Sequence, residues 1–109
     1  MVNTNIKVIF GGGGLGYPGG SWSTKENIAE LLNVLEEEHV KVIDTAQAYG
    51  ASETFLGETN AASRFVIDTK YPGGLFPTEA TKETVINSGE DSLKKLKTDC
   101  VCGPNPRPI

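Results

Sequence analysis

Three residues of the sequence could together move a proton: Asp44, Tyr49 and Lys70. Each lies at or just after the predicted carboxyl end of a strand, where parallel α/β enzymes place their catalytic groups. A free tyrosine, with a pKa of ~10, is a reluctant acid at neutral pH, but a nearby ammonium stabilises the phenolate and makes proton donation easier. A carboxylate beside that ammonium holds it in place and keeps it charged. The three residue types therefore indicate acid catalysis by a phenol.

Each of the three residues also has an ordinary structural explanation. A strand-end aspartate often caps the next helix, a loop tyrosine often only packs, and a strand-end lysine is usually solvated. Taken singly, those explanations are preferred, so the catalytic interpretation depends on the surrounding motif.

The elements that position these residues alternate along the chain. Strands are predicted over residues 6–10, 40–44 and 64–70, and a fourth begins at 99–102. Helices are predicted between them, which implies parallel strands with right-handed crossovers. The prolines that follow residue 102 cannot continue a central strand, because they lack the ladder donor.

Helix-start signals and apolar stripes define the helices. Ser23 and Glu26 form a predicted capping box before the first helix, which ends near Glu38. Behind the box, apolar residues recur at helical spacing: Ile28, Leu31, Leu32 and Leu35. A short helix is predicted from about Ser52. Thr78 is the predicted cap of the last helix, whose apolar positions include Val85, Ile86, Leu93 and Leu96.

A glycine-rich stretch, FGGGGLG, follows the first predicted strand and contains G-x-G-x-x-G at Gly11, Gly13 and Gly16. In dinucleotide-binding loops the third glycine opens a helix that faces the pyrophosphate. Here YPGG follows Gly16, and Asp44 lies 28 residues after Gly16 instead of about 20. The stretch therefore predicts an open loop above the strand end that could still contact a cofactor. A small doubly wound nucleotide-binding module stays open as the alternative.

Length and charge exclude several classes of protein. The chain has 109 residues, 38% of them hydrophobic and 22% charged, which suits one small domain. A net charge of -4 argues against nucleic acid or an anionic membrane as the main partner. No apolar run reaches the ~18 residues of a membrane span, and the N-terminus lacks the pattern of a secretory signal.

The two cysteines, Cys100 and Cys102, stand in the segment DCVC. A disulfide between them on an extended backbone would be strained, so we expect reduced thiols in a cytoplasmic protein. No second cysteine or histidine cluster completes a metal site, and none is predicted.

The segment Ile43–Gly57, IDTAQAYGASETFLG, closely resembles the aldo-keto reductase signature. In that signature Asp-Thr-Ala is followed by Tyr-Gly and then by Ser-Glu with Leu-Gly. FVIDTKYP and SLKKLKTDCV are similar to the family's lysine-bearing strand and to the run that follows it. The resemblance covers residues 6–101 and is nearest to the aflatoxin-aldehyde-reductase-like branch.

The resemblance implies an α/β fold: an incomplete (β/α)8 TIM barrel with the first three βα units and a truncated fourth strand. It implies NADPH-dependent reduction of an aldehyde or ketone, with Tyr49 protonating the carbonyl oxygen, Lys70 tuning Tyr49 and Asp44 holding Lys70. NADP(H) would contact Gly12, Gly13 and Asp44. Residues 1–102 would form the N-terminal part of the barrel, and residues 103–109 a divergent Pro-rich tail.

The chain departs from the family's pattern at the fourth strand, where the family carries a histidine. TDCV is followed by CGPNPRPI, and His39, which precedes the second strand, is not expected to act in catalysis. Phosphate-binding loops after strands 7 and 8 are also absent. We therefore expect weak or no cofactor binding and little or no turnover by this chain. A non-enzymatic role, with association through open strand edges, stays open as a further alternative.

Overall fold

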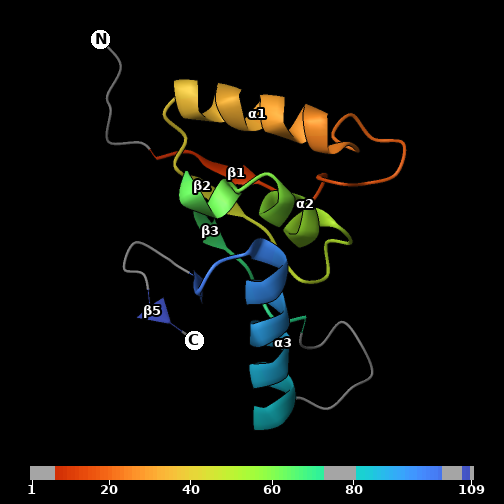
Figure 1. Ribbon diagram of the computed structural model, residues 1–109, viewed down its shortest axis with the longest axis vertical. Helices are drawn as coiled ribbons and strands as arrows, with labels where there is room; N and C mark the ends of the chain where they lie inside the picture. Colours follow the sequence, from red (N-terminus) through yellow and green to blue (C-terminus); the bar gives the residue numbers. More distant parts are fainter. Residues whose placement is uncertain (1–6, 73–80, 102–106, 109) are drawn as a thin grey trace.

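The computed structural model describes residues 7–72, 81–101 and 107–108, and its elements follow the predicted alternation (Figure 1). Three strands and three helices make up the main body: β1 (Ile9–Gly11), α1 (Lys25–Glu37), β2 (Val42–Asp44), α2 (Ser52–Glu58), β3 (Val66–Asp68) and α3 (Lys82–Leu96). A 3-10 turn, η1 (Ala61–Ser63), lies between α2 and β3.

The three strands form a parallel sheet in the order β1-β2-β3, as the alternation predicted. Each regular strand has three residues and is shorter than the predicted run, because only three residues of each strand pair with a neighbouring strand. The register sets Gly11, Asp44 and Asp68 abreast at the carboxyl edge. In the middle row Ile43 and Ile67 are buried, and Phe10 is half-buried.

The predicted apolar stripe of α1 is confirmed. All four of its residues are buried in the core that also holds Ile43, Leu56 and Leu96: Ile28, Leu31, Leu32 and Leu35. The predicted cap is wrong by one position: Thr24, not Ser23, is the N-cap, and its hydroxyl accepts from Asn27 N at 3.1 Å. Either hydroxyl could satisfy a free N–H of the first turn, so sequence alone does not choose between them.

The last helix, α3, starts later than predicted. Its N-cap is Thr81, which exchanges hydrogen bonds with Thr84 in a capping box, so the prediction of Thr78 is wrong. Thr78 itself lies outside the described residues. Leu96 is buried, but Val85 and Ile86 are 43% and 40% exposed. They belong to the N-terminal half of α3, and Figure 1 shows that this half extends away from the sheet.

The predicted fourth strand does not join the main sheet. β4 (Cys100–Val101) pairs antiparallel with β5 (Arg107–Pro108) in a separate two-stranded sheet. Part of the predicted tail therefore forms a strand, although not a central one.

Candidate active site

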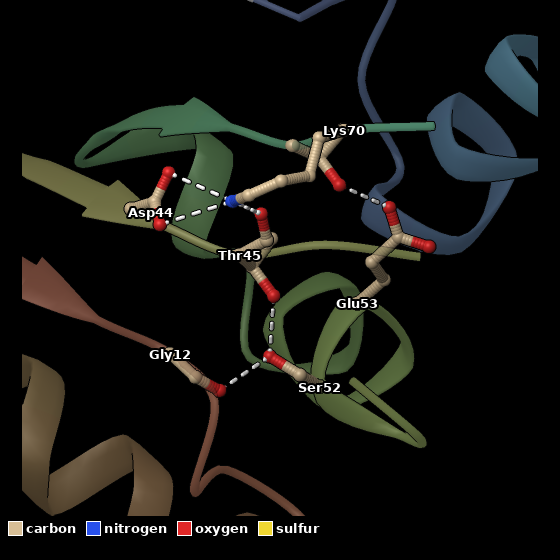
Figure 2. A network of polar contacts seen from close by, with 7 residues as sticks. Gly12, Asp44, Thr45, Ser52, Glu53 and Lys70 are labelled. Atoms are coloured by element: carbon tan, nitrogen blue, oxygen red, sulfur yellow. Dashed lines mark hydrogen bonds and ion pairs between the residues drawn. The ribbon is translucent and has the colours of Figure 1, made fainter. Parts of the chain in front are cut away.

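Asp44 and Lys70 meet at the carboxyl edge of the sheet (Figure 2). Lys70 Nζ donates to Asp44 Oδ1 at 3.1 Å, to Asp44 Oδ2 at 3.0 Å and to the carbonyl oxygen of Thr45 at 2.7 Å. Both side chains are about half exposed. Because β2 and β3 are adjacent and parallel, residues that follow their ends are brought together across a sequence separation of 26.

Tyr49 lies in the loop between β2 and α2 and faces the same ammonium. Lys70 Nζ is 5.3 Å from the centroid of the Tyr49 ring, which is within cation–π range. The loop turns back on itself there: Tyr49 N donates to Ala46 O at 3.1 Å, and Ser52 N donates to Tyr49 O at 3.0 Å. The structure thus brings the three sequence-predicted catalytic residues together, whereas their catalytic roles stay predictions.

His39 lies in the turn between α1 and β2, at the end of β2 opposite to Asp44. It is exposed and has a left-handed backbone with φ of 64°. Its amide donates to Glu36 O at 3.1 Å and so closes the end of α1. The position agrees with a structural role.

The glycine loop packs tightly onto the β2–α2 loop. Gly12 N donates to Asp44 O at 2.7 Å, and a Cβ at Gly12 would lie 3.1 Å from that same oxygen. Gly16 has φ of +75°, and a Cβ there would come 2.8 Å from the Phe55 ring. Gly16 therefore allows the chain to turn, and Gly12 allows the two loops to approach closely. The Gly12 amide is already hydrogen-bonded to Asp44 O.

Gly13 and Tyr49 are direct neighbours. A Cβ at Gly13 would lie 3.8 Å from Tyr49 Cε2, in ordinary van der Waals contact. Gly13 is exposed, whereas Gly12 is buried. Of the residues predicted to contact a cofactor, Gly13 is exposed next to Tyr49 and the Asp44 side chain is about half exposed, whereas Gly12 is buried.

A buried hydroxyl pair, which sequence reasoning missed, fixes the start of α2. Thr45 Oγ1 and Ser52 Oγ are 2.7 Å apart, and Ser52 Oγ donates to Gly12 O at 2.9 Å (Figure 2). Both residues are fully buried. Thr45 and Ser52 both belong to the motif between Asp44 and Leu56, but no sequence pattern indicated that their hydroxyls would meet.

Two further links join this region to β3 and α3. Glu53, at 1% exposure, accepts from Thr69 Oγ1 at 2.6 Å. The side chain of Gln47 makes two hydrogen bonds to Ser88 of α3, with Nε2 donating to Ser88 O at 3.3 Å and Oε1 accepting from the Ser88 hydroxyl. These links hold the Tyr49 loop between the sheet and α3.

An uncharged pocket opens beside Tyr49. It has a volume of about 450 Å³ and is lined from the first loop and from the loop that carries Tyr49: Gly13, Leu15, Gly16, Tyr17, Pro18, Ala48, Tyr49, Gly50 and Ala51. Its side chains are apolar apart from the two phenols. The pocket could receive the apolar body of a small molecule next to the Tyr49 side chain.

The surface beside Tyr49 is open, whereas the nearby Lys70 ammonium already has partners within the chain. The exposed Gly13 leaves open surface beside Tyr49. All the hydrogen bonds recorded for the Lys70 ammonium go to Asp44 and Thr45, so it offers little to a phosphate. Among the described residues, no three His, Cys, Asp or Glu side chains gather as a metal site. No described helix has the length and hydropathy of a membrane span.

Comparison with known proteins supports the family resemblance. The aldo/keto reductase family model matches residues 7–101. The chain is 35% identical over 97 residues to the oxidoreductase sirO of Leptosphaeria maculans, covering 82% of this chain and 29% of sirO. The aflatoxin-aldehyde-reductase-like branch is not distinguished by these matches.

Solved structures agree with the fold. A Pseudomonas aeruginosa protein assigned to the aldo-keto reductases superposes with a TM-score of 0.70 at 28% identity, over 85% of this chain and 39% of its own. An aldo-keto reductase from Bacillus halodurans, in its holo form, gives a TM-score of 0.63 at 20% identity over 33% of its length. The chain thus spans about a third of the length of these relatives. It belongs to the aldo/keto reductase family and has the α/β fold of a partial (β/α)8 barrel.

Proposed function

We propose that this chain carries the proton-donating part of an NADPH-dependent oxidoreductase that reduces an aldehyde or ketone to an alcohol. The observation that supports the proposal best is the convergence of Asp44, Lys70 and Tyr49 at one edge of the sheet. When bound, NADPH would supply the hydride, and the residues that would contact it are Gly12, Gly13 and Asp44. The carbonyl substrate would lie in the pocket beside Tyr49.

Tyr49 donates its hydroxyl proton to the carbonyl oxygen of the substrate. The phenolate that is left is stabilised by the Lys70 ammonium, which faces the ring. Asp44 and the Thr45 carbonyl fix the ammonium by three hydrogen bonds. A charge that is held in place before the reaction does not have to reorganise during it, and this is the main advantage of such an arrangement.

The 109-residue chain by itself is proposed to have little or no turnover. It spans 29% of sirO and 39% of the Pseudomonas aeruginosa protein, and the Lys70 ammonium is already bonded to Asp44 and Thr45. We also propose a cytoplasmic location, on the basis of the two cysteines expected as thiols; fractionation of cells that express the chain checks it.

A chimera tests the chemistry separately from the turnover of the isolated chain. Residues 7–101 replace the matching segment of the Pseudomonas aeruginosa protein, and NADPH oxidation with an aromatic aldehyde is followed. Tyr49→Phe should lower kcat by about 100-fold or more, because it removes the transferable proton. An active chimera that is indifferent to Tyr49→Phe would refute the role of Tyr49. Turnover by the isolated chain that Tyr49→Phe abolishes would refute its proposed inactivity.

A second proposal concerns association of the isolated chain with a second copy through its open strand edges. Within the described residues β1 pairs only with β2, and Val8 and Ile9 are 63% and 56% exposed. Light scattering should show concentration-dependent dimers that Ile9→Lys prevents. Val34→Lys, at a residue 52% exposed on α1, is the matched control and should leave the dimers intact. A monomer at all concentrations would overturn the proposal.

A further inference from the structure

Glu53 is a buried carboxylate to which the proposed chemistry gives no task. It is 1% exposed, and of its two oxygens Oε2 accepts from Thr69 Oγ1 at 2.6 Å. Oε1 has no hydrogen-bond partner among the described residues. Burial of a polar group is costly unless its hydrogen bonds are made. A half-satisfied buried carboxylate therefore calls for an explanation other than stability.

We infer that Glu53 is a positioning residue for Lys70, acting through Thr69. β3 ends at Asp68, so Thr69 and Lys70 lie just beyond the ladder. Their side chains bind different partners: Thr69 donates to Glu53. Lys70 donates to Asp44 and to the Thr45 carbonyl oxygen (Figure 2). A fixed Thr69 side chain fixes the backbone from which the Lys70 side chain departs.

The start of α2, which carries Glu53, is itself held by buried hydrogen bonds. Ser52, the preceding residue, is fully buried and bonded to Gly12 O and to the Thr45 hydroxyl. On the other side, Gln47 N donates to Lys70 O at 3.2 Å. The Thr69–Lys70 segment is thus held at its side chain by α2 and at its backbone by the Tyr49 loop.

The importance of this inference rests on the proposed function, because the order of Lys70 matters to catalysis only if Lys70 assists Tyr49. Its test does not depend on turnover. The measurement is hydrogen exchange of the Lys70 ammonium protons by NMR on the 109-residue chain, with the Lys70 signal assigned by its loss in Lys70→Met. The thermal midpoint of each variant is measured alongside.

Glu53→Met removes the oxygen that accepts from Thr69 and the oxygen that has no partner, while it keeps a similar length. We expect Lys70 exchange to be faster by about tenfold, because the Thr69 side chain loses its hydrogen bond and fixes the backbone at Lys70 less firmly, with a thermal midpoint that is unchanged or higher. Thr69→Val should also speed the exchange but lower the midpoint, because it leaves Glu53 with no partner at all. Thr69→Ser should restore slow exchange. Glu58→Met, at an exposed carboxylate of the same helix, is the matched control and should change neither.

The inference is wrong if Lys70 exchange in Thr69→Val equals that of the control. It is also wrong if Glu53→Met lowers the midpoint and leaves the exchange rate of the folded chain unchanged, since Glu53 would then be only structural. If Glu53→Met does not fold, the comparison of Thr69→Val with Thr69→Ser decides. If Lys70 exchanges slowly but Lys70→Met leaves the chimera fully active, the proposed function is refuted. The positioning of Lys70 by Glu53 would still stand.

Discussion

Gly57 of α2 lies directly against the backbone of Lys95 in α3. A Cβ at Gly57 would fall 1.8 Å from the Lys95 carbonyl oxygen, so no side chain is possible without separating the helices. The glycine that closes the family motif therefore serves helix packing, and the chemistry at the other end of α2 depends on it only indirectly.

Replacing that glycine should destabilise the fold strongly. Gly57→Ala forces α2 and α3 apart, and we expect the free energy of unfolding to fall by about 3 kcal/mol or more, above the usual range for overpacking because the obstacle is backbone. Urea denaturation followed by circular dichroism measures it. Gly14→Ala, where nothing lies within 4 Å of the added carbon, is the control and should change the free energy little. Equal effects of the two substitutions would contradict the packing argument.

Substitutions at two glycines of the first loop can distinguish the cost of backbone strain from the cost of steric crowding. Gly16 and Gly19 both have positive φ, but only Gly16 has a neighbour, the Phe55 ring, in the way of a Cβ. Gly19→Ala should cost about 1 kcal/mol of unfolding free energy for its conformation alone, and Gly16→Ala about 1–3 kcal/mol more. The difference between the two variants in the same denaturation assay gives the steric part. A larger effect at Gly19 would show that the loop packs differently.

The core of α1 should tolerate no large deletion. Leu32 is fully buried in the cluster that joins α1 to the sheet, and Leu32→Ala should lower the unfolding free energy by about 2–5 kcal/mol. Val34→Ala, on the exposed side of the same helix, should change it by less than about 0.5 kcal/mol. Comparable losses at the two positions would mean that α1 does not bury the predicted face.

The ion pair at the sheet edge should matter far more to chemistry than to folding. Asp44 and Lys70 are about half exposed, and such pairs contribute about 0–1 kcal/mol to stability. Lys70→Met should therefore shift the thermal midpoint only slightly, while in the chimera it should lower kcat by about 100-fold, because the phenolate loses its stabilising charge. Lys41→Met, at an exposed lysine between α1 and β2, is a control for both measurements. If Lys70→Met lowers stability strongly and leaves kcat unchanged, the ion pair is structural and does not assist Tyr49.

The order of elements and the α1 core were predictable from sequence because each depends on local periodicity. The spacing of apolar residues defines the α1 stripe, and the ends of the predicted strands already placed Asp44 and Lys70 near one edge. The caps were not predictable. Ser23 and Thr24 are adjacent and chemically alike, and the choice of Thr81 for α3 depends on where the helix packs.

The supporting contacts of the site were hidden from sequence for a different reason. Gln47 and Ser88 are 41 residues apart, and Glu53 and Thr69 are 16 apart. No local pattern distinguishes a buried glutamate in the first turn of a helix from an exposed one. The separate sheet of β4 and β5 likewise depends on long-range pairing, although the prolines had already excluded a central strand.

The pairing of β2 with its neighbours has a consequence for how the protein avoids misassembly. Ile43 and Asp44 are consecutive, so they point to opposite faces of the sheet, and only Ile43 is fully buried. A strand displaced by a single residue would drive the Asp44 carboxylate in among leucines, at a cost of several kcal/mol. The cost of removing Asp44 from water thus disfavours the shifted register. In the native register the Asp44 carboxylate is already placed to pair with Lys70 before any ligand binds.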